Sequence, residues 1–418
     1  MHRRFTGLWR HPEFLKYWTA SAISDVGSQV TALALPLIGA LMLNATPWQM
    51  GMLTASGTAP ILLVGLFAGV WVDRLRRRPV LIATDVGRAL LLSTIPLASV
   101  LDVLSIGLVC AVALLVGTLS LMFDIAHLAF LPSLVTREHL VDGNAKLETT
   151  SATAQVVGPS LGGGLIGALG APFAVLLDAL SFLGSAWLIK RTRATETPPV
   201  RALDRPTIWA EIREGFRVVR AQPLLLALAG ASATMNFFGR MFLAVYVLYM
   251  TRDLGLGAVG VGLVLATGGV GSLAGALVAG PVTRRLGVGR ALIVAQIGFG
   301  LTGLLVPLAV LVPSVALVMI VGSEIGQWMA VTVYYIDAVS VRQAITPDRL
   351  QGRVNATIRF FAGGLLPLGA LAGGALGGVI GLPLTLVVAE LGTLFGVVWL
   401  VLSPVRTLRA LPKVATAG

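Results

Sequence analysis

Long apolar runs separated by short polar stretches make up nearly all of this 418-residue chain. A helix needs roughly 20 predominantly apolar residues to cross a bilayer, and twelve runs have about that length. Most are apolar on every side, as helices in the core of a membrane bundle are. We expect membrane-spanning helices at residues 14–43, 48–72, 79–101, 103–128, 143–169, 172–190, 224–250, 257–283, 290–311, 313–340, 355–381 and 383–403.

The composition supports a membrane protein without a cofactor. Hydrophobic residues make up 56% of the chain and charged residues only 12%, whereas about a quarter of a soluble domain is charged. The net charge of +12 does not indicate nucleic-acid binding, because the basic residues form short clusters between the apolar runs. A single cysteine, Cys110, and four scattered histidines indicate neither a disulfide framework nor a metal site. The sequence also contains no GxxxxGK[ST] loop, the motif that would bind a nucleotide.

A sequence repeat divides the chain into halves. The segment GVWVDRLRRRP, residues 69–79, recurs 211 positions later as GPVTRRLGVGR, residues 280–290. The pair Gly162–Gly163 recurs at the same offset as Gly373–Gly374. Six helices followed by six in the same orientation form a parallel repeat, as found in secondary transporters. We therefore expect an all-α integral membrane fold with two six-helix bundles and a linker, at residues 1–190, 223–418 and 191–222 respectively.

The basic residues predict the orientation in the membrane. If the N-terminus is cytoplasmic, 29 of the 31 lysines and arginines lie on that side, and only Arg240 and Arg252 do not. This count includes Arg88, at the start of the third expected helix. The positive-inside rule then places both ends of the chain in the cytoplasm. We expect a multi-pass protein of the cell (inner) membrane.

Within the linker, residues 206–222 have an amphipathic pattern. Ile208, Ile212, Phe216 and Val219 fall on one helical face, opposite a charged face. We expect an amphipathic helix on the inner surface of the membrane, and a solvated linker is the alternative. No loop is long enough for a soluble catalytic domain.

The turn at residues 69–79 combines a carboxylate with an arginine cluster. It resembles motif A of the major facilitator superfamily, G-x-x-x-D-[RK]-x-G-[RK]-[RK], except that Arg76 replaces the usual glycine. The resemblance implies a conformational gate, in which Asp73 meets a helix end or an arginine in one state only. A stop-transfer cluster with an incidental aspartate is the alternative. The expected gate residues are Gly69, Asp73, Arg74, Arg77, Arg78 and, as a partner on the fourth helix, Asp124, with Asp337 a further candidate on the tenth.

Residues 154–164, AQVVGPSLGGG, resemble motif C, G-x-x-x-G-P-x-x-G-G, which occurs mainly in the antiporters of the superfamily. Its glycines would let another helix backbone approach, and its proline removes one hydrogen bond and kinks the helix. Ordinary glycine-rich packing is the alternative. The motif favours export over uptake, and its residues are Gly158, Pro159, Gly162 and Gly163.

Polar side chains within the spans predict the transport site. Each charge costs about 2.5–3.5 kcal/mol at a helix centre on insertion scales, so each needs a function or a partner. Pairs of such residues lie near the middle of the first, seventh and tenth helices, which line the central cavity in the fold that the motifs imply. The expected substrate- and proton-binding residues are Asp25, Gln29, Asn236, Arg240, Glu324 and Gln327.

Two further expectations concern the remaining intramembrane charges. We expect Asp25 to pair with Arg240 through the repeat and to sense substrate, while Glu324 carries the proton. Asp178 and Glu390 lie on helices that usually face outward or sideways, so we expect them to form structural pairs.

Over nearly its whole length the chain resembles the superfamily branch that includes macrolide-efflux and enterobactin-exporter-like proteins. The resemblance is carried by ALPL at residues 34–37, the segment 124–135 and LLDALSF at residues 176–182. It implies a secondary exporter of amphipathic small molecules, such as drugs, antibiotics or siderophores, that works by proton antiport and alternating access, and we expect a monomer. An importer or lysophospholipid flippase of the same fold is the alternative. A membrane-embedded enzyme needs a nucleophile or metal cluster near a membrane face, and the sequence has none.

Overall fold

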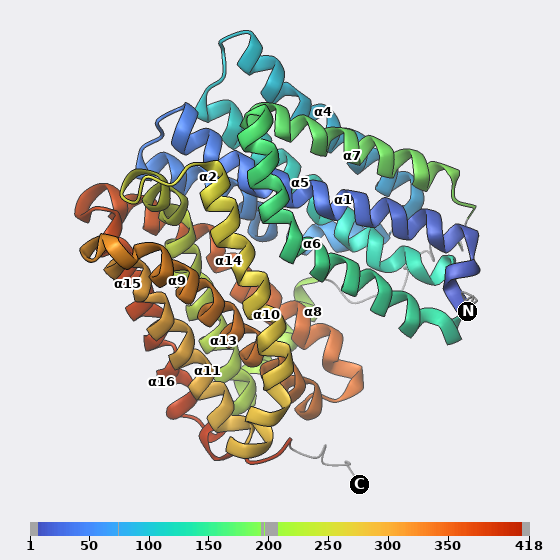
Figure 1. The fold of residues 1–418 in the computed structure, drawn as a ribbon. Helices are drawn as coiled ribbons and strands as arrows, with labels where there is room; N and C mark the ends of the chain where they lie inside the picture. Colours follow the sequence, from blue (N-terminus) through green and yellow to red (C-terminus); the bar gives the residue numbers. More distant parts are fainter. Residues whose placement is uncertain (1–6, 74, 194–195, 197–207, 412–418) are drawn as a thin grey trace, which may run out of the picture. The chain divides into compact units, whose positions relative to one another are not determined.

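The computed structural model describes residues 7–73, 75–193, 196 and 208–411, and all regular elements in these ranges are helices (Figure 1). The chain divides into two compact units. Unit 1 consists of Met1–Asn44, Ser56–Leu203 and Gly257–Ala266. Unit 2 consists of Ala45–Ala55, Asp204–Leu256 and Thr267–Gly418. Each unit therefore combines most of one half of the chain with a short segment of the other half.

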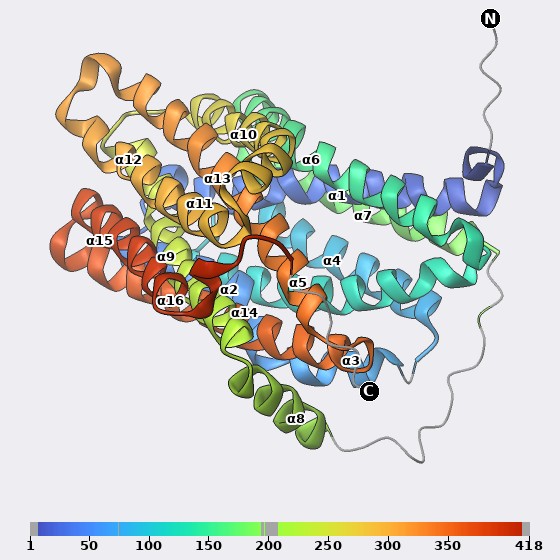
Figure 2. The same cartoon turned by 90° about the horizontal axis from the view of Figure 1, so that it is seen from below.

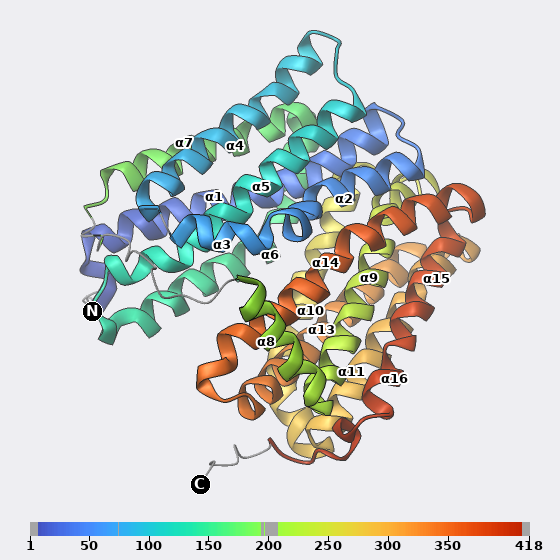
Figure 3. The same cartoon turned by 180° about the vertical axis from the view of Figure 1, so that it is seen from behind.

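In unit 1, the helices pack around an apolar core at one end of the bundle. They are α1 (Pro12–Leu37), α3 (Gly65–Asp73), α4 (Arg77–Val100), α5 (Ile106–Phe130), α6 (Leu140–Leu169) and α7 (Ala171–Arg191), together with parts of α2 (Pro47–Leu63) and α10 (Ala258–Leu286). Helix α7 lies alongside both α1 and α4 (Figure 3). Large side chains that are 0% exposed fill the core between them, among them Phe14, Tyr17, Leu81 and Phe130.

Unit 2 has the corresponding helices of the second half of the chain. They are α9 (Pro223–Arg252), α11 (Val288–Gly303), α12 (Leu305–Leu308), α13 (Ala316–Ile345), α14 (Asp348–Ile380), α15 (Leu382–Phe395) and α16 (Val397–Val401), with α8 (Ile208–Ala221) and the remaining parts of α2 and α10. Helix α9 packs on α14 and α15, and α11 packs on α13 and α15.

The expected spans agree with the helices in position but differ in regularity. Among the described residues, ten helical stretches are long and apolar enough to cross a membrane. Of the other two expected spans, residues 48–72 are divided between α2 and α3 by a break at Val64. The other is α6, which carries Asp142, Lys146 and Glu148 in its first turns. The all-α membrane fold predicted from the apolar pattern is confirmed.

Helix α8 forms where the amphipathic pattern predicts it, but its apolar face meets protein. A buried cluster joins α8, α9 and α14 through Val219, Leu225, Val354 and Ile358. The ring of Phe216 lies 5.4 Å from that of Phe361, and Glu214 forms an ion pair with Arg353 of α14. From Phe216 onward, the face that we expected on the membrane surface therefore packs on the first turns of α14 (Figure 2). The side chains of Ile208 and Ile212 lie outside the described residues.

Candidate functional site

A buried ion pair on α4 forms the centre of unit 1. Arg88 and Asp85 lie one turn apart, and their side chains are 4% and 0% exposed. The Arg88 guanidinium lies between two phenyl rings, 4.3 Å from the ring centroid of Phe123 on α5 and 4.0 Å from that of Phe182 on α7. A cation–π contact is worth about 2 kcal/mol away from water. Arg88 is therefore held by an ion pair and by both neighbouring helices.

This placement corrects the charge count made from the sequence. We assigned Arg88 to the cytoplasmic end of the third helix, and that is wrong, because its side chain is buried inside the bundle. The signal that could have found it is the spacing of Asp85 and Arg88. Opposite charges three residues apart on one helix are neighbours on the same face and can neutralise each other.

Asp178 of α7 lies next to this pair and is fully buried. Its carboxylate accepts hydrogen bonds from the hydroxyls of Thr31, at 2.5 Å, and Ser181, at 3.0 Å, and it interacts electrostatically with Arg88. Gly27 of α1 makes room for it, since a Cβ there would lie 2.3 Å from an Asp178 carboxylate oxygen. The sequence led us to expect a structural pair at Asp178 but did not identify these partners.

Two more carboxyl groups face the same arginine. Asp25 of α1 is half-buried and interacts electrostatically with Asp124 of α5 and with Arg88. Arg88 also interacts with Asp85, Asp124 and Asp178. Asp124 is exposed, whereas Asp85 and Asp178 are buried. One guanidinium cannot offset four carboxylates, so this cluster can take up protons or a cationic group.

A second polar cluster lies in unit 2 around Glu324 of α13. The indole nitrogen of Trp328 donates a hydrogen bond to Glu324 at 3.1 Å. The amide nitrogen of Gln327 donates to the Ser323 hydroxyl at 3.1 Å and to Glu390 of α15 at 3.4 Å. Glu324 and Glu390 are 7% and 1% exposed. Glu324 and Gln327, which the sequence singled out, thus lie one turn apart on α13, and Gln327 contacts Glu390 of α15.

The two polar residues expected on α9 have other surroundings. Asn236 donates its side-chain amide to the carbonyl of Ala362 on α14 at 3.1 Å. Arg240 is half-buried, and among the described residues no carboxylate forms an ion pair with it. Arg240 belongs to unit 2 and Asp25 to unit 1, so their pairing stays a prediction.

The arginine-rich turn before α4 is anchored by the segment that follows α7. Glu196 accepts hydrogen bonds from the backbone amides of Arg77 and Arg78, at 2.7 and 2.9 Å. This carboxylate caps the first turn of α4 and complements the positive end of its dipole. Arg78 in turn donates to the carbonyls of Ile189 and Lys190 at the end of α7. The first residues of the linker therefore hold this turn in place.

The described residues include only part of the expected gate. Gly69 and Asp73 end α3, but the side chain of Asp73 and all of Arg74 lie outside the described residues. In the second copy of the turn, Asp337 of α13 accepts a hydrogen bond from Thr283 of α10 at 2.8 Å. A carboxylate on α13 therefore reaches the counterpart of the gate turn, although the gate itself stays a prediction.

The glycines of α6 lie against helix backbones on two sides; the motif residues in this helix are Gly158, Pro159, Gly162 and Gly163. A Cβ on Gly158 would lie 2.3 Å from the Cβ of Gln29 on α1, and one on Gly162 would lie 3.3 Å from the backbone of α1. A Cβ on Gly163 would lie 2.9 Å from the Cα of Gly262 on α10. A side chain at Gly158 or Gly163 would therefore force its neighbours to move, and one at Gly162 would be tight.

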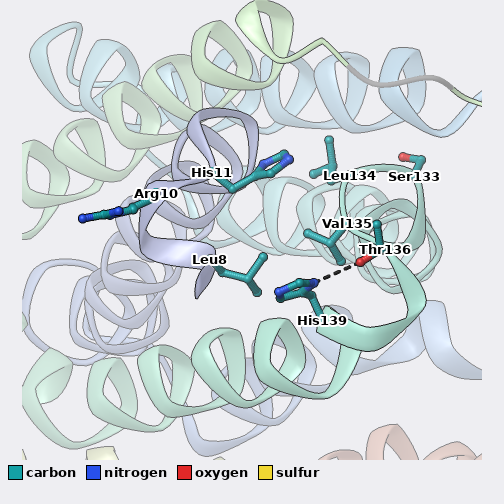
Figure 4. A pocket seen from close by; sticks show the side chains of 8 residues that line it. All are labelled: Leu8, Arg10, His11, Ser133, Leu134, Val135, Thr136 and His139. Carbon is teal, nitrogen blue, oxygen red and sulfur yellow. Dashed lines mark hydrogen bonds between the residues drawn. The ribbon is translucent and has the colours of Figure 1, made fainter. Parts of the chain in front are cut away.

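A surface pocket lies apart from all these residues, at one end of unit 1 (Figure 4). It is lined by Leu8, Arg10, His11, Ser133, Leu134, Val135, Thr136 and His139, and His139 is hydrogen-bonded to Thr136 at 2.9 Å. None of the expected site residues lines it. The buried clusters of the two bundles, rather than this pocket, therefore form the candidate transport site.

Comparison with known families agrees with this arrangement. Residues 6–417 match the family model described as transmembrane secretion effector. The chain belongs to the transmembrane secretion effector family. Members of this major facilitator family are transporters, so this chain is a multi-pass membrane transporter and not an enzyme.

Relatives of this transporter cover nearly its full length. The multidrug efflux pump Tap of Mycolicibacterium fortuitum is 28% identical over 405 residues, covering 93% of this chain and 95% of the pump. The enterobactin exporter EntS of Salmonella typhimurium is 27% identical over 423 residues, covering 98% of this chain and 96% of the exporter. The predicted membership of an efflux branch of the major facilitator superfamily is confirmed.

Solved structures confirm the fold of the transporter. A bacterial homologue of the iron transporter ferroportin, in an inward-facing state, superposes with a TM-score of 0.77 at 15% identity, covering 95% of this chain and 99% of the other. A bacterial homologue of the human lysosomal transporter Spinster gives a TM-score of 0.69 at 16% identity, covering 95% and 97%. The major facilitator fold follows from these matches.

Replacing Gly158 of the transporter with alanine is expected to lower the free energy of unfolding by about 1–3 kcal/mol, because the added methyl group overpacks the contact with Gln29. Gly164 is the matched control, since a Cβ there meets nothing within 4 Å. The melting temperatures of the two purified variants measure the difference. Equal melting temperatures would show that α1 and α6 can separate without cost.

Proposed function

We propose that this efflux transporter exports amphipathic small molecules in exchange for protons. Its direction of transport follows its family and its relatives, which include a multidrug efflux pump and an enterobactin exporter. Proton exchange is supported by the excess of carboxyl groups over cations around Arg88, which four carboxyl groups of unit 1 share; two of these four, Asp85 and Asp178, are buried. A carboxyl group that changes its neighbours during transport can bind a proton in one state and release it in another.

In the proposed transport cycle, the cluster around Arg88 and the cluster around Glu324 have different roles. Asp25 is half-buried beside Arg88, so it can exchange a proton for a group on the substrate. Glu324 is nearly fully buried and is hydrogen-bonded to Trp328, which suits a group that carries a proton through the protein. Gln29, Asn236, Arg240 and Gln327 supply the other polar contacts to substrate. Asp73, with the arginines of its turn, gates the change between inward- and outward-open states.

We also propose the placement of the chain in the membrane. Even without Arg88, nearly all basic residues lie between the spans on one side, so both ends of the chain face the cytoplasm of the inner membrane. The transporter works as a monomer, because each chain carries two bundles and both polar clusters.

Everted membrane vesicles test this function. Their outer face is the cytoplasmic face, so an exporter takes up an added fluorescent amphipathic compound when the vesicle interior is acidic, and releases protons from the interior as it does so. Collapse of the pH difference should abolish the uptake. Uptake only into intact cells would indicate an importer, and uptake that does not depend on the pH difference contradicts proton exchange.

The same vesicles test the orientation of the chain. Added protease should cleave tags at both ends of the chain, and protected tags contradict the proposed orientation.

A further inference from the structure

A row of side chains in contact joins α7 to α1 in unit 1. The Arg88 guanidinium of α4 contacts the rings of Phe182 and Phe123. The ring of Phe123 stacks on that of His127, also on α5, with centroids 5.6 Å apart. The His127 ring stacks in turn on Tyr17 of α1, with centroids 4.9 Å apart. His127 is therefore the member of this row through which α5 contacts α1.

Hydrogen bonds also join His127 to α1. Nε2 of its ring lies 2.9 Å from the Ser21 hydroxyl, and its backbone carbonyl accepts a hydrogen bond from the Tyr17 hydroxyl at 2.9 Å. Ser21 donates its single hydroxyl proton to the carbonyl of Tyr17 at 3.1 Å, so Nε2 of His127 is the donor in the bond to Ser21. Ser21 and Tyr17 are 6% and 0% exposed, so water does not readily replace these bonds.

Side chains, more than backbones, connect α1 with α5. The backbone of α1 packs mainly on α6 and α7, and that of α5 packs mainly on α4. Besides His127, Phe130 of α5 contacts α1, with its ring edge-on to Tyr17 at 5.4 Å. Stacked rings tolerate sliding, whereas a hydrogen bond weakens steeply with distance and angle. The bonds of His127 therefore define how α1 is aligned along α5.

This alignment determines which carboxyl groups face each other. Asp25 lies one turn beyond Ser21 on α1, and Asp124 lies one turn before His127 on α5. Residues three or four apart on a helix share a face, and the first and fourth spans cross the membrane in opposite directions. The bond between Ser21 and His127 thus brings Asp25 to the level of Asp124, and the two carboxyl groups interact electrostatically.

We propose that His127 is a positioning residue of this transporter, which aligns α1 with α5 through its hydrogen bond to Ser21 so that Asp25 faces Asp124. It acts through Asp25 rather than on the substrate, and no covalent bond changes. This inference rests on the proposed role of Asp25 in transport and adds a residue on which the placement of Asp25 depends.

Three variants separate the hydrogen bond from the ring. His127→Gln keeps a nitrogen that can donate to Ser21 and loses the ring. His127→Phe keeps a ring that can stack on Tyr17 and loses the donor. Ser21→Ala removes the acceptor and suits a helix, so it serves where His127→Phe does not fold. His139→Gln is the matched control, because His139 is exposed and lies apart from the polar clusters.

Spin labels on α1 and α5 measure the alignment in the full-length transporter in lipid nanodiscs. Cysteines at the exposed positions Ile23 and Leu115 carry the labels, and Cys110→Ala removes the single native cysteine. Electron paramagnetic resonance gives the distribution of distances between the labels. We expect this distribution to shift or broaden in the two variants without the hydrogen bond, and to stay unchanged in His127→Gln and the control.

Uptake of the fluorescent compound into everted vesicles measures the effect on transport. Each variant without the hydrogen bond should raise the substrate concentration for half-maximal uptake roughly two- to tenfold, which corresponds to one hydrogen bond. The double variant Ser21→Ala with His127→Phe should do no more than either alone, because both remove the same bond. His127→Gln should stay within about twofold of wild type. A purely structural role would lower the amount of folded protein and leave the half-maximal concentration unchanged.

Three results would overturn the proposal: unchanged label distances in His127→Phe and Ser21→Ala, altered distances with an unchanged half-maximal concentration, or additive effects in the double variant. None of them depends on proton exchange. Uptake without proton release would refute the proposed exchange, while the label distances and the half-maximal concentration would still decide on His127.

Discussion

Replacing Arg88 with methionine is expected to lower the free energy of unfolding by about 3–5 kcal/mol, because it leaves the Asp85 carboxylate buried without its partner. The side chain also loses its cation–π contacts with Phe123 and Phe182, although methionine fills a similar space between the rings. The melting temperature of the purified protein and the yield of folded protein from the membrane measure this loss.

The matched control for Arg88→Met removes both charges at once. The double variant Asp85→Asn with Arg88→Met leaves no carboxylate at position 85 without its partner, so it should recover the part of the lost stability that this ion pair supplies, although Asp178 still loses the nearby cation. Arg88→Lys keeps the charge but loses the flat guanidinium that stacks between the two rings, so it should recover only part. If Arg88→Met is as stable as wild type, the ion pair does not support the fold of unit 1.

Replacing Asp25 with asparagine is expected to reduce substrate-driven proton release at least about tenfold while leaving the protein folded, because an amide cannot bind and release a proton. Asp25 is half-buried beside Arg88 and Asp124, where substrate or a proton can offset its charge. Proton release is measured in everted vesicles, and folding by the melting temperature.

Asp102→Asn is the matched control for Asp25→Asn. Asp102 is exposed in the turn between α4 and α5 and has a φ of 55°, a left-handed conformation that asparagine adopts as readily as aspartate. This variant loses the same charge outside the spans, so it should transport as wild type does. If both variants retain proton release, Asp25 is not part of the coupling, and Asp178 and Asp124 are the next carboxyl groups to test.

The helices could be predicted closely because each depends on a local requirement. A run of about 20 apolar residues has no favourable place outside lipid or a protein core, and a helix satisfies its own backbone hydrogen bonds. The expected span at residues 172–190, for example, is α7 at Ala171–Arg191. The break at Val64 between α2 and α3 was not predicted, although Pro60 and Gly65 on either side of it are residues that weaken a helix.

The polar clusters could be predicted only in part from the sequence. The sequence identified Asp25, Glu324 and Gln327 because a polar residue in the middle of a span is costly wherever it points. It misplaced Arg88, because a basic residue eleven positions after Arg77 can belong either to the membrane surface or to the interior, and only the packing of Phe123 and Phe182 decides between them. It expected a structural pair at Glu390 but named no partner, since the apolar pattern does not reveal that α15 turns this carboxyl group toward Gln327 and Gly303.

The sequence by itself thus determined the membrane fold, the duplication and the family of transporters, because hydrophobicity, charge bias and motif spacing are properties of the chain read in order. Only the tertiary structure decided which charges meet. Pairing requires residues from different helices to lie within hydrogen-bonding distance, such as Thr31 and Asp178 at 2.5 Å and Gln327 and Glu390 at 3.4 Å. The rotation of each helix about its axis sets those distances, and a helix that is apolar on every side leaves no trace of that rotation in its sequence.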